Sequence, residues 1–283
     1  MIAPFLPIIL LASGAIALFV TGRPFWGAGA VPTKHARFMS LQATSSILNT
    51  LVSIAVVGKP ILQHLQKNDW TTDLVPSFLV APLTILAIAS VYAMLAAVVF
   101  FFFRAIRNIN FFSGMKLRSP YSAFFMLIPI SNLVVIPYLE YFAYHRSIEA
   151  ASPERASRMR AACLVASAFT LLVISLAISR LGEEATQASN YDPLSLLVLT
   201  VCTGGAGGIL TTRIISGISK DQNNWALQHG LILDAVAGAA PTRGSKTLDR
   251  LKTASVAILL AATIVVAMFP TLPSRTIQTV YQL

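Results

Sequence analysis

Long stretches without a charged residue constrain this chain more than any other feature. Seven stretches of at least 19 residues contain no Lys, Arg, Asp or Glu: residues 2–20, 38–58, 74–103, 119–139, 161–179, 193–212 and 253–274. About 20 apolar residues in a helix span the hydrocarbon core of a bilayer, so each stretch is long enough to cross. Only 11% of all residues are charged, against about 25% in soluble domains. The sequence therefore predicts an all-α integral membrane protein.

The positive charges between these stretches predict how the chain is threaded. If all seven stretches cross, the 21 Lys and Arg residues divide 9 against 12 between the two sides. If residues 119–139 enter and leave on one side, they divide 17 against 4, which the positive-inside rule strongly favours. That stretch also contains Pro120, Pro129 and Pro137, which would break a straight helix. We therefore predict a bundle of six crossing helices plus one proline-broken re-entrant or interfacial element, with both termini outside the cytoplasm.

Two predicted spans carry faces that suit contact with other helices. In residues 38–58, four polar side chains recur at steps of four, three and four and share one helical face: Gln42, Ser46, Asn49 and Ser53. Such a polar stripe turns away from lipid, either to hydrogen-bond neighbouring helices or to line the path of a solute. In residues 193–212, Gly204 and Gly208 are four residues apart, a spacing that indicates a helix-packing face. No Lys-Ser or Lys-Thr follows these glycines, which argues against a phosphate-binding loop.

No residue pattern indicates catalysis, a cofactor or a metal site. The four histidines form no H-E-x-x-H motif, and no two stand at metal-ligand spacing. None of the six predicted crossing helices contains an acidic residue, which weakens proton-coupled transport as an activity. Cys163 and Cys202 lie in apolar stretches and are expected to be small buried side chains without a disulfide. The net charge of +10 is attributed to cytoplasmic loops, since no basic block with interleaved aromatics indicates nucleic acid.

The middle of the chain contains a set of short motifs that belong together. Residues 103–108 read FRAIRN, residues 118–121 RSPY, residues 125–133 FMLIPISNL and residues 137–140 PYLE. Over about residues 40–226 the chain resembles the bacterial domain-of-unknown-function 4328 family. The Trp pair usual in that family is replaced here by Phe124 and Phe125. The resemblance implies a multi-pass protein of the bacterial plasma (inner) membrane, and it implies no activity.

These motifs predict a polar cluster on the cytoplasmic side of the membrane. Arg104 and Arg107 are three residues apart at the end of a predicted span, where their long side chains can reach the membrane surface. Asn132 can satisfy backbone groups freed by the prolines, and Glu140 can pair with either arginine. The predicted cluster consists of Arg104, Arg107, Asn108, Asn132 and Glu140. It either fixes the re-entrant turn to the preceding helix or forms a cytoplasmic pocket for a small anion, a lipid headgroup or a partner segment.

The chain divides into three predicted parts. Residues 1–39 form an N-terminal span and cytoplasmic loop. A signal peptide begins with positive charge, whereas no charged residue precedes this span, so the span is expected to be retained. Residues 40–226 form the family-like membrane core, and residues 227–283 form a cytoplasmic linker and the last span. Within residues 213–252, apolar residues such as Ile214, Ile215 and Ile218 alternate with polar ones, which predicts amphipathic helices on the membrane surface. Residues 238–244 are expected to be a linker.

Three functional hypotheses fit these observations. The leading one is a non-enzymatic scaffold, sensor or accessory subunit of a membrane complex, in contact with the lipid bilayer and with protein partners or further copies of itself. The second is a transporter or channel for a small solute, for which the re-entrant element and the polar stripe would provide the path. The third, an enzyme acting on lipids, has only Arg104 and Arg107 as possible headgroup-binding residues.

Overall fold

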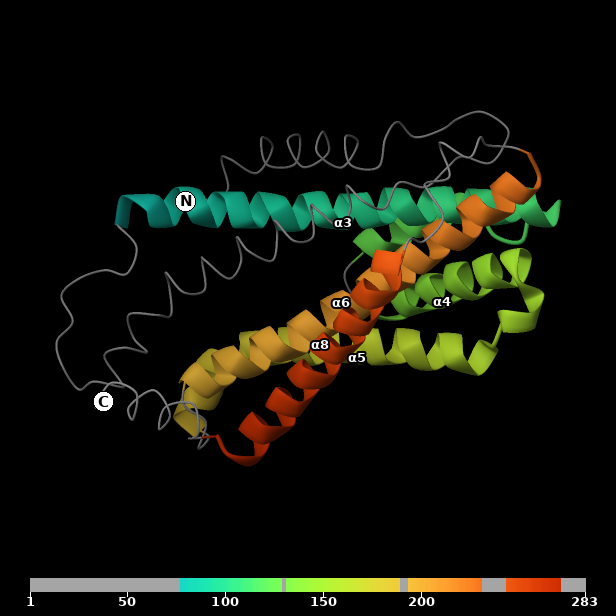
Figure 1. Cartoon of the computed structure of the whole chain (residues 1–283). Coiled ribbons are helices and arrows are strands. Elements are labelled where there is room, and N and C mark those ends of the chain that lie inside the picture. The colour runs from blue at the N-terminus through green and yellow to red at the C-terminus, as the bar shows by residue number, and fades with distance from the viewer. Residues whose placement is uncertain (1–76, 129–130, 189–192, 231–242, 271–283) are drawn as a thin grey trace. The chain divides into compact units, whose positions relative to one another are not determined.

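Helices form every element in the part of the chain that the structure describes. The computed structural model describes residues 77–128, 131–188, 193–230 and 243–270. In these ranges the elements are α3 (Ser77–Ser113), the 3-10 helix η2 (Pro120–Leu127), α4 (Asn132–Ala151), the 3-10 helix η3 (Pro153–Arg155), α5 (Arg158–Ala188), α6 (Pro193–Gln228) and α8 (Arg243–Met268) (Figure 1). The predicted all-α class is confirmed for these residues. The first two predicted spans lie outside them.

Four of the helices are long and apolar enough to cross a membrane. The segments that meet this condition are Ile88–Ser113, Arg158–Ser179, Leu194–Gln228 and Arg250–Met268. They correspond to the third, fifth, sixth and seventh uncharged stretches of the sequence. The fourth stretch, residues 119–139, is divided instead between η2 and the start of α4. By length and composition, the chain is therefore a membrane protein with several candidate spans.

Helices α3 and α6 extend well beyond the uncharged stretches. With 37 and 36 residues, each is about 55 Å long, whereas the hydrocarbon core is about 30 Å thick. The continuation of α6 to Gln228 corrects the prediction of surface helices after residue 212. Ile214, Ile215 and Ile218 have 0% exposure, because their side chains pack against other helices and not against the membrane surface. Helix α8 begins at Arg243, so the predicted linker ends earlier than residue 244.

The described residues fall into two compact units. The first contains Pro82–Val165 and the described residues from Thr212 onward in α6. It therefore holds most of α3, all of η2, α4 and η3, and the ends of α5 and α6 that adjoin them. The second contains the remainder of α5, the first half of α6, and α8. The predicted polar cluster lies wholly in the first unit, and the predicted glycine face lies in the second.

In the first unit the chain reverses direction where α3 ends. Gly114 takes a positive φ of 63°, which glycine adopts without strain. The Asn110 side chain holds the turn, donating to the Arg118 carbonyl at 2.6 Å and accepting from the Arg118 amide at 3.2 Å. Tyr121 of η2 then packs edge-on against Phe103, with ring centroids 5.5 Å apart. Thus η2 runs back along the helix that precedes it.

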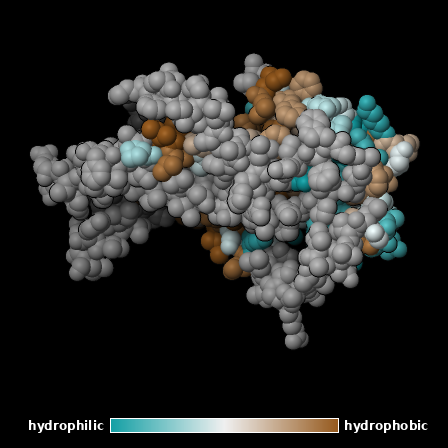
Figure 2. Space-filling model, turned by 90° about the horizontal axis from the view of Figure 1, so that it is seen from above, coloured by the Kyte–Doolittle hydropathy of each residue, from teal (hydrophilic) through white to brown (hydrophobic). Residues whose placement is uncertain are grey.

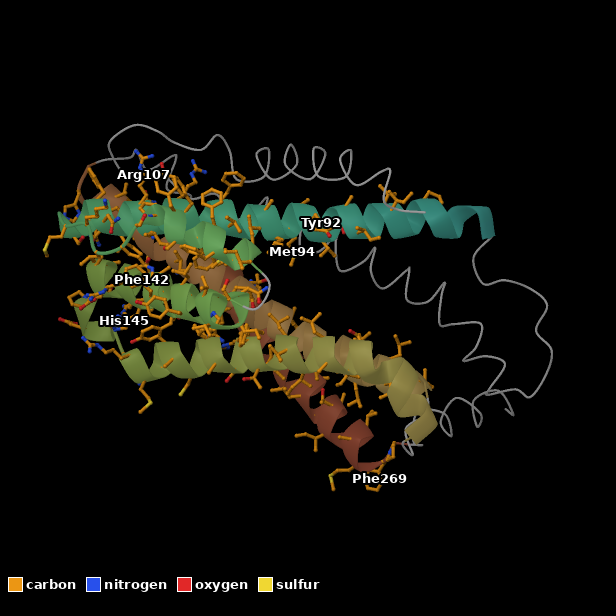
Figure 3. All side chains as sticks on the ribbon, turned by 180° about the vertical axis from the view of Figure 1, so that it is seen from behind. Tyr92, Met94, Arg107, Phe142, His145 and Phe269 are labelled. Carbon is orange, nitrogen blue, oxygen red and sulfur yellow. The ribbon has the colours of Figure 1, made fainter. Side chains whose placement is uncertain are left out.

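Helix α4 returns to the end of α3 from which η2 departed. Its last turns place Arg146 and Glu149 around the same cavity as Ile109 and Phe112 of α3. The segment from Arg118 to Glu149 therefore begins and ends beside one end of α3. Both ribbon views place α4 alongside the C-terminal half of α3 (Figures 1 and 3).

The second unit is held together by close contacts among α5, α6 and α8. Ser175 of α5 donates a hydrogen bond to the Thr200 carbonyl of α6 at 3.0 Å. Ser195, near the start of α6, donates to the carbonyl of Pro270, just after α8. Hydroxyl-to-carbonyl bonds of this kind are common between membrane helices, where few other polar partners exist.

Candidate functional site

A buried polar network joins three helices of the first unit. The Gln222 side chain on α6 accepts a hydrogen bond from the Asn108 amide on α3 at 2.9 Å. Its own amide nitrogen donates to the Ala105 carbonyl and to the Ser147 hydroxyl on α4, both at 3.1 Å. Gln222, Asn108 and Ser147 are at most 2% exposed. We call these three side chains the Gln222 network.

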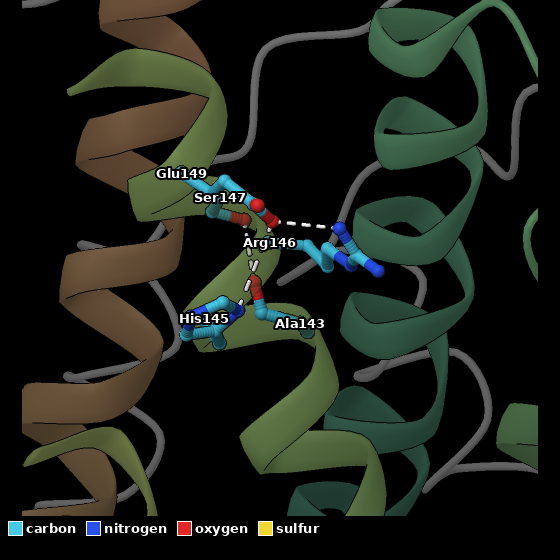
Figure 4. Close-up of polar contacts among 5 residues, drawn as sticks. All are labelled: Ala143, His145, Arg146, Ser147 and Glu149. Atoms are coloured by element: carbon cyan, nitrogen blue, oxygen red, sulfur yellow. Dashed lines mark hydrogen bonds and ion pairs between the residues drawn. The ribbon is translucent and has the colours of Figure 1, made fainter. Parts of the chain in front are cut away.

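The Gln222 network fixes the relative positions of α3, α4 and α6. Ser147 also donates to the Ala143 carbonyl one turn earlier in α4, at 2.6 Å (Figure 4). Its hydroxyl is thus donor within its own helix and acceptor between helices. A buried network whose members are bonded to each other rigidifies a core, because sliding one helix would leave polar groups unpaired. The arrangement therefore sets helix register.

Glu140 lies on the same face of α4 as Ala143 and Ser147, three residues before Ala143 and seven before Ser147. Its exposure is 3%, and within the described residues no hydrogen bond or ion pair involves its carboxyl group. Burial raises the pKa of Glu140 from 4.5 to about 8, because the charged form loses its hydration. The carboxyl group is therefore mostly protonated at neutral pH.

The structure divides the predicted polar cluster. Asn108 belongs to the Gln222 network. Asn132 is the first residue of α4, and its 15-residue separation from Ser147 in one helix corresponds to about 22 Å. Glu140 is buried two turns before Ser147 and pairs with neither arginine, which corrects the predicted ion pair.

The two arginines of that cluster have different surroundings. Arg104 is 9% exposed and lies one turn before Asn108 in α3. Arg107 is half-buried, and in Figure 3 its side chain lies above α3, whereas α4, with Phe142 and His145, lies below. The five residues consequently do not form a single binding site. The polar stripe Gln42, Ser46, Asn49 and Ser53 lies outside the described residues.

Sequence reasoning missed Ser147 and Gln222. A signal for Gln222 was present, because it follows Ile215 and Ile218 at the spacing of one helical face. Recognising it required knowing that α6 continues past residue 212. Ser147 gives no comparable signal, since the helix around it mixes polar and apolar residues on all sides.

A cavity of about 210 Å³ opens beside the Gln222 network, at the end of the first unit. Its charged lining residues are Arg146 and Glu149, which form an ion pair at 2.7 Å (Figure 4). Its aromatic lining residues are Phe112 and Trp225, whose rings stack with centroids 4.0 Å apart. Ile109, Ser113, Leu117 and Ala150 complete the wall.

Glycines in the second unit allow a close approach of α5 and α6. A Cβ atom added at Gly204 would lie 2.8 Å from the Ser175 hydroxyl, and one at Gly207 would lie 2.9 Å from Leu172 and 3.1 Å from its backbone nitrogen. Gly204 therefore lies in close contact with α5. The second close approach described is at Gly207, three residues on, and the role predicted for Gly208 stays a prediction.

Within the described ranges, no three His, Cys, Asp or Glu side chains come together in a way that could hold a metal ion. Both cysteines are free, and Cys202 is buried as expected whereas Cys163 is exposed. No protein-family model, curated protein or solved structure matches this chain. The family resemblance of residues 40–226 therefore stays a prediction, and the geometry described above is the basis for the function proposed below.

Proposed function

We propose that this chain is a non-enzymatic membrane subunit, a scaffold, sensor or accessory component of a larger membrane complex. One observation carries the proposal: the buried amide and hydroxyl side chains at the common end of α3, α4 and α6 are bonded to each other. Groups used in this way fix helices in place. An active site, by contrast, holds polar groups ready for a substrate.

The end of the first unit offers a surface on which a partner can dock. Its exposed cationic side chains include Lys116, Arg155, Arg158, Arg160 and Lys220. In Figure 2, hydrophilic side chains gather in teal at the end where α3 ends. The Gln222 network holds α3, α4 and α6 in register, so the part of this surface that carries Lys116 and Lys220 is rigid. It suits an acidic partner segment or anionic lipid.

The proposed topology has six crossing helices and a re-entrant or interfacial element at residues 119–139, with both termini outside the cytoplasm of a bacterial inner membrane. The return of α4 to the same end of α3 supports it. Single cysteines test it, in a background lacking Cys163 and Cys202. Cysteines at Lys67 and Arg180 should react with an impermeant reagent on intact cells, and cysteines at Lys116, Arg155 and Lys246 should not. Reaction at Arg155 without reaction at Lys116 would show that residues 119–139 cross.

Purification in a mild detergent tests the scaffold role. The native chain should copurify with defined partners or with further copies of itself, in a fixed ratio. Gln222→Met should release them, because it loosens the surface on which they dock. Gln228→Met makes the same chemical change at an exposed position of α6 and should retain them. A monodisperse monomer from which nothing copurifies would contradict the scaffold role.

A second candidate function, transport of a small solute coupled to protons, is favoured by Glu140. This carboxyl group is 3% exposed within the helix bundle, and ionisable residues at such positions in membrane proteins frequently carry protons. Protein reconstituted into vesicles with a pH-sensitive dye would reveal proton flux. Glu140→Gln should abolish the flux if the protein is a transporter, and alanine at Gln42 and Asn49 should impair it with assembly intact. Loss of assembly in those variants would favour the scaffold.

A further inference from the structure

The cavity beside the Gln222 network lies at the depth of lipid headgroups. The apolar segment Ile88–Ser113 of α3 includes three of its lining residues. The uncharged stretch ends at Phe103, so Ile109 lies six residues, or about 9 Å, beyond it along the helix. Headgroups occupy roughly the first 5–8 Å outside the hydrocarbon core. The cavity thus opens at the outer edge of the headgroup layer.

The tip of the first unit has the composition of a segment that sits in the membrane interface. Phe111, Met115 and Leu117 are exposed at 41%, 65% and 39%, and Lys116 between them is exposed as well. Apolar side chains that alternate with a lysine enter the headgroup region while the ammonium group stays in water. Leu117 also lines the cavity. The cavity and this interfacial tip are therefore continuous.

The cavity carries one positive and one negative side chain. Arg146 and Glu149 are about 40% exposed, and His145 lies 3.8 Å from the same Glu149 oxygen. The balance of charge disfavours a simple anion or a simple cation, either of which would meet one repelling group. A zwitterion is complementary to both. An exposed ion pair contributes little on its own, so a ligand that bonds to the outer atoms of both partners need not break a strong interaction.

The size of the cavity limits the group that fits. An engineered cavity of about 150 Å³ holds benzene, and sites for drug-sized ligands begin at about 300 Å³. At about 210 Å³, this cavity accommodates a group of headgroup size. The stacked rings of Phe112 and Trp225 on one wall suit the glycerol and first methylenes of an attached lipid.

We propose that this cavity binds phosphoethanolamine chemistry, with the phosphate accepting hydrogen bonds from Arg146 and the primary ammonium donating to Glu149. The source is either the headgroup of a zwitterionic phospholipid or soluble phosphoethanolamine. The site is independent of the assembly proposed above, because it uses residues of a single chain.

Lipid retention measured by native mass spectrometry tests the site. Purified protein is equilibrated in detergent with equal amounts of phosphatidylethanolamine and phosphatidylglycerol, and the lipid that stays bound is identified. The ethanolamine lipid should be retained several-fold more. Arg146→Gln and Glu149→Gln should each lower its retention about tenfold, the usual cost of losing one charged hydrogen bond. Arg250→Gln and Glu154→Gln, the same changes at exposed positions outside the cavity, should not.

A second variant keeps the test decisive if the charge changes disturb folding. Ala150→Leu fills the cavity with an apolar side chain and leaves both charges in place, and it should also abolish retention. Titration with soluble phosphoethanolamine distinguishes the two sources. Binding is monitored by the fluorescence of Trp225, in a variant in which Trp26 and Trp70 are changed to Phe. A change in emission identifies the free compound as a ligand, and retention of lipid without such a change identifies the lipid. Equal retention of both lipids, or native retention by Ala150→Leu, would overturn the proposal.

Discussion

Removing the amide of Gln222 tests whether the Gln222 network holds the first unit together. Gln222→Met keeps an unbranched side chain of similar length and removes every side-chain hydrogen bond. Three bonds are lost, to Asn108, Ala105 and Ser147. A hydrogen bond between membrane helices contributes about 0.6 kcal/mol to stability on average. Hydrogen bonds in proteins generally contribute up to about 1.5 kcal/mol. The expected loss in the free energy of unfolding is therefore about 2–5 kcal/mol.

Thermal unfolding in detergent, followed by circular dichroism, measures this loss. For a chain of this length, 1 kcal/mol shifts Tm by roughly 2–4 °C, so Gln222→Met should melt at least several degrees below the native protein. Gln228→Met, at an exposed position of the same helix, should melt within about 1 °C of it. Similar Tm values for the two variants would refute the stabilising role of the network.

A double-mutant cycle shows whether Asn108 and Gln222 act through their shared bond. Asn108→Leu and Gln222→Met each remove the bond between the two amides, so the double variant loses it only once. The double variant should therefore cost about 0.5–1.5 kcal/mol less than the sum of the single changes. Strict additivity would mean that the 2.9 Å contact contributes nothing to stability.

Further predictions concern Glu140 and the glycines. Because the pKa of Glu140 is raised from 4.5 to about 8, the folded state keeps a proton that the unfolded state loses, so stability should fall between those pH values by up to about 3–5 kcal/mol. Glu140→Gln should remove this fall in a series of Tm measurements from pH 4.5 to 9, and an unchanged pH profile would contradict it. Gly217→Ala places a Cβ 2.8 Å from the Tyr144 ring and should lower stability by about 1–3 kcal/mol, a loss that Tyr144→Ala should relieve in the double variant. The Cβ added by Gly207→Ala would press on the backbone of α5, whereas the Cβ added by Gly205→Ala would contact one Leu259 methyl at 3.3 Å. Gly207→Ala should therefore lower Tm more than Gly205→Ala. Equal shifts in Tm would argue against tight packing at Gly207.

Fold class could be predicted from the sequence, because the exclusion of charge from apolar spans is a local property of the chain. The ends of the helices could not be predicted in the same way. Charge counting ended one span at residue 103 and another at residue 212, whereas α3 and α6 continue to Ser113 and Gln228. A helix does not stop where it leaves the hydrocarbon if another helix covers its next turns. The burial of Ile214 and Ile218 is what continues α6.

The proline-broken element has a path that local sequence describes only in part. Counting Lys and Arg predicts that residues 119–139 return to the side of the membrane from which they start, and this stays a prediction. In the described residues the chain reverses at Gly114 and comes back to the end of α3 through α4. The motifs of that region also marked Asn108 and Glu140 as unusual. They could not show that the partner of Asn108 is Gln222, 114 residues later in the chain, because pairing between distant helices leaves no trace in local spacing.

Glu140 shows most clearly why the site could not be read from the sequence. It lies one residue beyond the fourth uncharged stretch but about two turns inside a continuous α4, so the sequence placed it at a surface beside two arginines. Its surroundings in the bundle reverse the expected effect of removing its charge. A paired carboxylate would make Glu140→Gln destabilising, whereas a buried carboxyl group without an ion pair in the described residues makes the same change stabilising above about pH 8. The direction of that single change, measured at pH 8.5, therefore decides between the two environments.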